Sequence, residues 1–145
     1  MRGRLIVAAC AAGLLIAPAA EAATWRGKTK QGRTVTVRTG ADGLVSHVMF
    51  RYNAGCTDGK GFRHRIEFAP PLDASATNAF QDGGVVTWRF TKTRERARGR
   101  VSIGGGLRSS GRWTGNFRLR VKIRRGGRVV ATCRSGRVGW KASPV

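Results

Sequence analysis

The sequence has few of the side chains that enzymes use for acid–base or metal chemistry. Its 145 residues include only 7 Asp and Glu, 2 His and 3 Cys. Hydrolytic sites usually need paired carboxylates, a His base or a cluster of metal ligands, and no CxxC pair is present to begin a zinc site. We therefore expect no catalytic residue, no metal site and no cofactor.

Long apolar runs are also missing, except at the start of the chain. There a short basic segment precedes an apolar run at 5–16 and an Ala20-Glu21-Ala22 cleavage motif. This pattern is typical of a secretory signal peptide, and the run is shorter than the roughly 20 apolar residues of a membrane-spanning helix. We expect a signal peptide over 1–22, a single domain over 23–145, and a secreted or extracytoplasmic protein without a transmembrane segment.

Cysteine is scarce, and two of the three cysteines fall in the predicted mature chain. Cys10 lies too early in the apolar run for a lipoprotein cleavage site. In an exported protein, Cys56 and Cys133 favour a single disulfide. The alternatives are a nucleophilic cysteine or a metal site, to which only His47 and His64 could contribute.

Negative charge is scarce and positive charge is abundant. Loss of Arg2, Arg4 and Glu21 with the signal peptide leaves a net charge of +20, and residues 89–141 hold 17 basic residues against Glu95 alone. Such a surface attracts polyanions, and arginine suits bidentate contacts with phosphate, sulfate or carboxylate. The alternative is that a GC-rich genome enriches Arg, Gly and Ala without any selection for binding.

Helical spacing is almost absent, and apolar residues recur at every second position. Glycine-rich turns, among them one at Asp82-Gly83-Gly84, separate the runs. Many short strands at such spacing are typical of one all-β domain, an antiparallel β-sandwich or small barrel. The expected strands cover the neighbourhoods of 34–38, 44–52, 62–68, 86–90, 101–103, 113–123, 129–133 and 138–140. Only 69–80 breaks the pattern, and there Asp73 could cap a helical turn at 74–76 within a crossover.

Residues 117–124 read FRLRVKIR, which places four apolar side chains on one face of a strand and four cations on the other. If this strand pairs with 128–134 through a three-residue loop at 125–127, Leu119 faces Cys133. On the outer face, this register places Arg118 opposite Arg134 and Arg124 opposite Arg128. Like charges directly opposite each other destabilise a sheet unless salt screens them or an anion bridges them.

Several segments together resemble a type of small secreted actinobacterial β-domain protein of unknown function. They are the opening TWRGKTKQGRTVTV, Cys56 after an aromatic strand, the segment GRWTGNFRLRV and the ending CRSGRVGWKA. The resemblance implies a compact β-sandwich with a Cys56–Cys133 disulfide. It implies no activity, catalytic residue or ligand.

The histidines offer little to an enzyme. His64 shares a face with Phe62 and Ile66, so we expect a buried core histidine, whereas His47 should be solvated. Glu67 points to the other face from His64, which leaves a secreted ribonuclease-like hydrolase as a minor alternative.

Glycine and tryptophan also have structural explanations. Gly104-Gly105-Gly106 lacks a following Lys-Ser/Thr pair and a helix, so it predicts a turn or bulge and no nucleotide site. Trp88, Trp113 and Trp140 alternate with apolar residues and are expected in the core, while Trp25 could be exposed for stacking.

Two hypotheses about function remain. The first is a non-catalytic module that binds polyanions. The polyanion would be an anionic polymer of the cell envelope, a polysaccharide or extracellular nucleic acid. The predicted binding residues of the module are Arg94, Arg96, Arg98, Arg100, Arg118, Arg120, Lys122, Arg124 and Arg128. The second is a structural or protein-interaction domain with no specific polyanion ligand, for which the basic residues should be scattered. The sequence does not give the oligomeric state.

Overall fold

The computed structural model describes residues 22–69, 73–76 and 78–145, so all but the last residue of the predicted signal peptide lies outside the described residues. No described residue is helical, and none of them forms a helix that could cross a membrane. The strands are β1 (Thr24–Thr29), β2 (Thr34–Thr39), β3 (Val45–Cys56), β4 (Gly61–Phe68), β5 (Asp73–Ala76), β6 (Ala79–Phe90), β7 (Glu95–Leu107), β8 (Trp113–Arg125) and β9 (Arg128–Pro144). The all-β prediction is confirmed.

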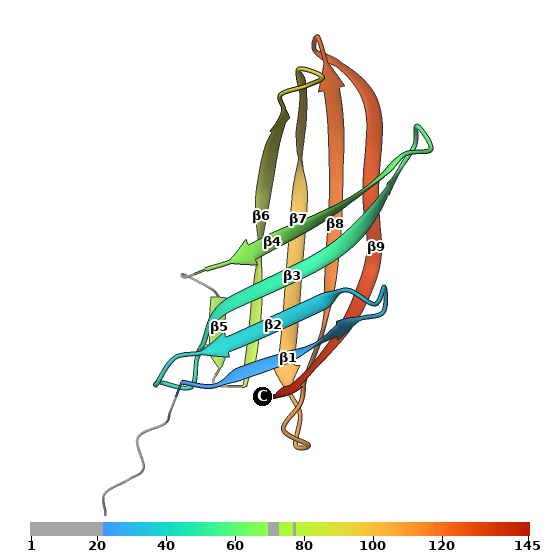
Figure 1. Cartoon of the computed structure of the whole chain (residues 1–145). Helices are drawn as coiled ribbons and strands as arrows, with labels where there is room; N and C mark the ends of the chain where they lie inside the picture. The colour runs from blue at the N-terminus through green and yellow to red at the C-terminus, as the bar shows by residue number, and fades with distance from the viewer. Residues whose placement is uncertain (1–21, 70–72, 77) are drawn as a thin grey trace, which may run out of the picture.

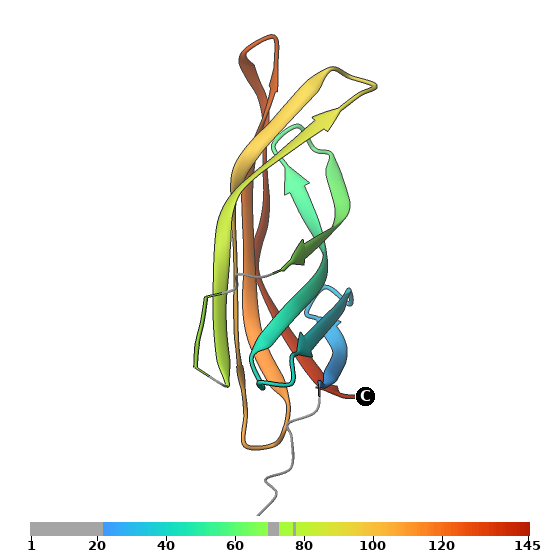
Figure 2. The same cartoon turned by 90° about the vertical axis from the view of Figure 1, so that its left-hand side faces the viewer.

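The strands form one antiparallel sheet that folds over on itself into two layers. Its order is β4-β3-β2-β1-β9-β8-β7-β6-β5. In one layer the long strands β6 to β9 run side by side, and β1 to β4 cross their inner face (Figures 1 and 2). The two layers are continuous through β9, whose C-terminal end pairs with β1. The result is a sandwich made from a single sheet, one of the two architectures, sandwich or small barrel, that the alternating pattern predicted.

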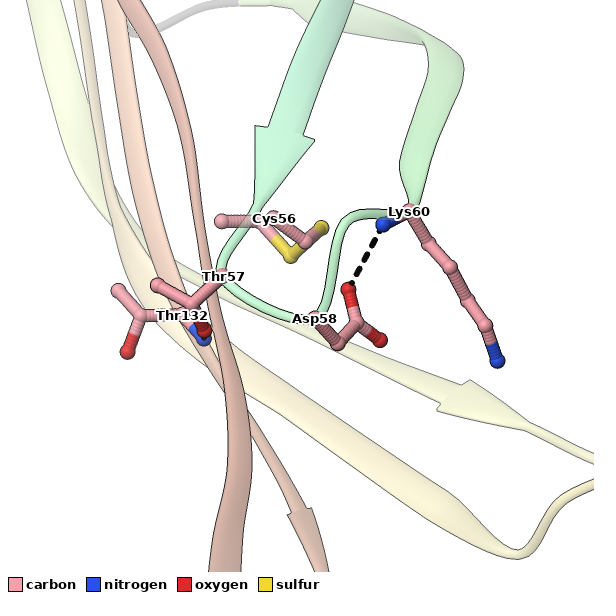
Figure 3. The surroundings of a disulfide bond; sticks show 6 residues. Cys56, Thr57, Asp58, Lys60 and Thr132 are labelled. Carbon is pink, nitrogen blue, oxygen red and sulfur yellow. Dashed lines mark hydrogen bonds between the residues drawn. A yellow bond between two sulfur atoms is a disulfide. The ribbon is translucent and has the colours of Figure 1, made fainter.

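A disulfide joins β3 to the first half of β9. Cys56 at the end of β3 pairs directly with Cys133, and their sulfur atoms are bonded. Next to the bond, Thr57 and Thr132 exchange hydrogen bonds: each backbone N–H donates, one to a carbonyl oxygen and one to a hydroxyl, both at 3.0 Å. Figure 3 shows these residues beside the tight turn in which Asp58 accepts from the Lys60 N–H at 3.1 Å. The predicted disulfide is therefore confirmed.

The core fills the space between the layers. Phe50 and Tyr52 of β3 lie on Phe117 of β8, with ring centroids 4.4 and 4.9 Å apart. These three side chains are fully buried. Burial also raises the pKa of Tyr52. Aromatic contacts of this kind make a large contribution to folding, and they fix which face of β8 is internal.

Two glycines leave room for the Trp140 ring in this core. A Cβ atom on Gly105 would lie 2.6 Å from Trp140, and one on Gly115 would lie 2.5 Å from it. Trp113 and Trp140 are buried, and Trp88 is half-buried. Trp25, which the sequence left open, is also half-buried: its ring meets Trp113 edge-on and its Nε1 donates to the Gly111 carbonyl at 3.1 Å. Trp25 is therefore part of the structure of the sandwich.

The predicted register of the last hairpin is wrong, because the loop between β8 and β9 has two residues rather than three. Gly126 and Gly127 both have positive φ, 53° and 82°, and form a two-residue loop. Positive φ at both central residues is the geometry of a tight hairpin turn. The register then shifts between Arg124 and Ile123, so that Val121, rather than Leu119, faces Cys133.

Three local predictions are also corrected. Gly104-Gly105-Gly106 is part of β7, and the predicted turn at Asp82-Gly83-Gly84 is part of β6. Residues 73–76 form β5, which pairs with β6, rather than a helical turn. In each case the chain continues a ladder of strand pairing, which supplies hydrogen bonds that a turn would lack. Residues 70–72 and 77 of the predicted crossover lie outside the described residues.

Candidate functional site

The outer face of the β6–β9 layer carries positive charges in rows that run across the strands. Paired residues of antiparallel strands point to the same side, so the register gives each row. We call the end with the β6–β7 and β8–β9 turns the hairpin end. Starting from it, the rows are Arg89-Arg96-Arg124, Arg98-Lys122, Arg100-Arg120-Arg134 and Arg118-Arg137. All of these side chains are exposed, and we call them the cationic face. Successive rows are two residues apart, about 6.7 Å, so the face is about 20 Å long.

Seven of the nine predicted binding residues belong to this face. They are Arg96, Arg98, Arg100, Arg118, Arg120, Lys122 and Arg124. Arg94 instead lies in the β6–β7 turn with a φ of 54°, and Arg128 lies at the β8–β9 hairpin opposite Arg125. Both remain exposed at the hairpin end but stand apart from the rows.

Three members were not among the predicted binding residues. Arg134 was expected on the outer face, but opposite Arg118, whereas it lies opposite Arg120. Arg89 could have been found, because it alternates with Trp88 on β6. Arg137 could not have been found, because strict alternation counted from the inward Cys133 would predict an inward side chain at 137. The register shift at Ser135 and Gly136, where Gly136 has a φ of 69°, turns Arg137 outward instead.

Among the described residues, no carboxylate interrupts the cationic face. Within β6 to β9 the acidic residues are Asp82 and Glu95, which pair with the core residue Ile103 and with Phe90 and so face the other side. Glu95 forms an ion pair with Arg125, outside the face. Hydrogen bonds from Thr93 and Arg125 lower the pKa of Glu95. Among the described residues, no ion pair therefore neutralises a member of the face.

Many cations of the face lie directly opposite one another. Like charges at opposed positions repel and destabilise the sheet. The opposed pairs are Arg89–Arg96, Arg96–Arg124, Arg98–Lys122, Arg100–Arg120, Arg120–Arg134 and Arg118–Arg137. A bound anion between two such side chains would turn repulsion into attraction.

Most of these side chains are free to contact a ligand. Within the described residues, only two members of the face donate side-chain hydrogen bonds to the protein: Arg124 to the Gly127 carbonyl at 3.0 Å and Arg137 to Oδ1 of Asn116 at 3.1 Å. A free guanidinium offers five N–H donors in a planar fork. The arrangement can therefore make many bidentate contacts with oxyanions.

The other layer is less uniform. The outer face of β1 to β4 also carries arginines, including Arg26, Arg38 and Arg51. Here, however, Glu67 lies among the basic residues and contacts both Arg65 and His47, at 3.2 and 3.7 Å. The two outer faces thus differ in the presence of a carboxylate.

The two histidines point to opposite sides of their layer and do not form an acid–base pair with each other. His64 is exposed, and the prediction of a buried histidine is wrong. β4 is the last strand of its layer, so the His64 ring lies at an open edge, edge-on to Trp88 at 5.5 Å. His47 is half-buried beside Glu67 and points outward with Arg38, whereas His64 points inward with Tyr52. Among the described residues, no group of three or more His, Cys, Asp or Glu could hold a metal ion.

No protein-family model, curated protein or solved structure matches the chain. The resemblance to small secreted actinobacterial proteins stays a prediction.

Proposed function

We propose that this protein is an exported, non-catalytic module that binds anionic polymers through the cationic face. The observation that carries the proposal is the set of four consecutive rows of exposed cations without a carboxylate among them. An extended chain with a repeated negative charge would contact several rows at once. Cell-envelope polymers, polysaccharides and extracellular nucleic acid share this chemistry.

The arrangement supports this proposal over a structural domain whose basic residues are scattered. Scattered charge would place carboxylates and cations on all surfaces alike, whereas the described charged side chains on the outer face of β6 to β9 are all cations. The ribonuclease-like alternative gains no support, because His47 and His64 point to opposite sides of neighbouring strands.

The test compares two triple variants that each remove three charges. One is Arg118→Gln, Arg120→Gln and Lys122→Gln on the cationic face. Its matched control is Arg26→Gln, Arg38→Gln and Arg51→Gln on the other outer face. Affinity for a fluorescent single-stranded oligonucleotide and for labelled heparin is measured by anisotropy across a salt series, with circular dichroism as a check on folding.

We expect the first variant to lower the slope of log K against log[salt] for the oligonucleotide by about 2, since each lost phosphate contact removes about 0.7. The control should change the slope by less than about 1. Equal losses in both variants would mean that overall charge, and not this face, attracts the polymer, and would refute the proposal.

A further inference from the structure

Beyond the Arg118-Arg137 row, toward the C-terminal end of β9, the same side of the sheet is hollowed. The next two rows are Gly139-Asn116-Gly104 and Lys141-Thr114-Gly106, so glycines replace the large side chains of the rows above. The hollow has a volume of about 620 Å³. We call it the glycine depression. Its volume is within the range of about 300–1,000 Å³ that is typical of small-molecule sites.

Packing does not explain the two glycines contributed by β7. A Cβ atom on Gly104 or Gly106 would approach nothing closer than a carbonyl oxygen at 3.5 or 3.6 Å, an ordinary contact. Neither residue has a positive φ. Their neighbour Gly105, by contrast, is required by Trp140. Because glycine weakens a strand interior, glycine without a structural need often marks the close approach of a ligand.

Four cations surround the depression. Lys28 and Lys141 lie directly opposite each other on β1 and β9. The aliphatic part of Lys30 lies over Gly139, where an added Cβ would come within 3.3 Å of it. Arg108 Nε donates to the Thr114 hydroxyl at 2.9 Å, which holds the guanidinium at the rim. The described residues that line the depression include no acidic side chain.

The depression is continuous with the cationic face. A smaller hollow of about 260 Å³ joins them, and Gly104, Asn116, Arg118 and Arg137 line it. The Asn116 side-chain oxygen already accepts a hydrogen bond from Arg137, so its amide N–H groups remain as donors. A polymer on the face could place one of its units in the depression.

We infer that the glycine depression binds a single sugar unit that carries a phosphate or sulfate ester. Gly104 and Gly106 leave that part of the floor without side chains, which gives room for the sugar ring, and the four surrounding cations would contact the ester oxyanion. The inference deepens the proposed function and rests on it, because it assigns one unit of the bound polymer to a particular site.

The test uses glucose 6-phosphate, glucose 6-sulfate and glucose as probes of the wild-type protein. Binding is followed by amide NMR shifts of Gly104, Gly106 and Gly139, and affinity by calorimetry. We expect saturable shifts at these amides with a charged sugar and none with glucose. Comparison of the phosphate with the sulfate identifies which ester the site prefers.

Two variants remove the site in different ways. Gly106→Val fills the depression, and Gly84→Val is its control, since an added Cβ on Gly84 of β6 meets nothing within 4 Å. Lys28→Gln with Lys141→Gln removes charge without adding volume, which keeps the test valid if Gly106→Val fails to fold. We expect each site variant to weaken charged-sugar binding at least tenfold, and the control to change it less than twofold.

Absence of shifts at the three glycines, or unchanged affinity in both site variants, would overturn the inference. Its failure can be told apart from failure of the proposed function. If the charged sugars do not bind but the cationic-face triple variant still loses polymer affinity, only the inference falls. If the charged sugars bind but that triple variant keeps full polymer affinity, the proposed function falls and the depression stands as a separate site.

Discussion

Arg120, like Arg96, has a cation directly opposite it on each side, and its removal should make the protein more stable. It lies on β8 between Arg100 and Arg134, directly opposite both. Opposed Cβ atoms are about 5 Å apart, and we take a separation of roughly 7 Å between the charged groups, which splay apart. Two unit charges at that distance in water repel by about 0.6 kcal/mol. Salt reduces this to about 0.5 kcal/mol at 0.01 M and below about 0.1 kcal/mol at 1 M.

The substitution Arg120→Thr removes both repulsions and keeps a residue that favours strands. We expect the free energy of unfolding to rise by about 1 kcal/mol in 0.01 M salt, or about 3–6 °C in Tm for a domain of this size. In 1 M salt the gain should nearly vanish. Thermal unfolding followed by circular dichroism at both salt concentrations measures the difference.

Arg26→Thr provides the control. Arg26 lies on β1 opposite Thr36 and Ser143, so no cation faces it directly. Arg26→Thr also removes one positive charge, but in 0.01 M salt it should raise the free energy of unfolding by less than half as much as Arg120→Thr does. If Arg120→Thr destabilises the protein, or stabilises it equally at both salt concentrations, the repulsion argued from the register is refuted.

Three further predictions concern the scaffold. Replacing both disulfide cysteines by serine should lower the free energy of unfolding by roughly 4 kcal/mol, as urea unfolding of the oxidised wild type and the variant would show. Phe117→Ala should cost about 3–5 kcal/mol in the same assay, since Phe117 is fully buried against Phe50. Hydrogen bonds from Thr93 and Arg125 lower the pKa of Glu95, so its stabilising effect is complete above the unfolded-state pKa. That effect is lost as pH falls through the lower folded-state value, and Glu95→Gln should flatten this part of the stability–pH curve.

The sequence predicted most of the strands and the character of their faces, because side chains on a strand alternate between its two sides. Over 117–124 the alternation holds without interruption, and the structure has the apolar residues inside and the cations outside. Alternation fails where a register shift adds a residue to one strand. The shift between Ile123 and Arg124 changed the partner of Cys133, and the shift between Leu119 and Arg120 turned Arg137 outward. A single sequence does not show where its partner strand gains a residue.

The predictions for the glycine-rich segments were wrong for a different reason. Gly104-Gly105-Gly106 reads locally as a turn, because glycine is most common where φ is positive or the chain reverses. In the structure, Gly105 lies in a strand because the Trp140 ring occupies the space of its side chain. This contact joins residues 35 positions apart in the sequence, so local composition cannot reveal it. The same limit applies to His64, whose exposure depends on β4 being the last strand of its layer.

The disulfide and the cationic face are linked through β9. Cys133 faces inward and bonds to Cys56, while its neighbour Arg134 faces outward beside Arg120. Six opposed like-charge pairs at about 0.2–0.5 kcal/mol each would destabilise the sheet by about 1–3 kcal/mol. The disulfide contributes roughly 4 kcal/mol by the loop-closure argument, which is enough to offset that repulsion. The covalent bond at the inner side of β9 thus allows a face of like charges to persist on its outer side before any anion binds.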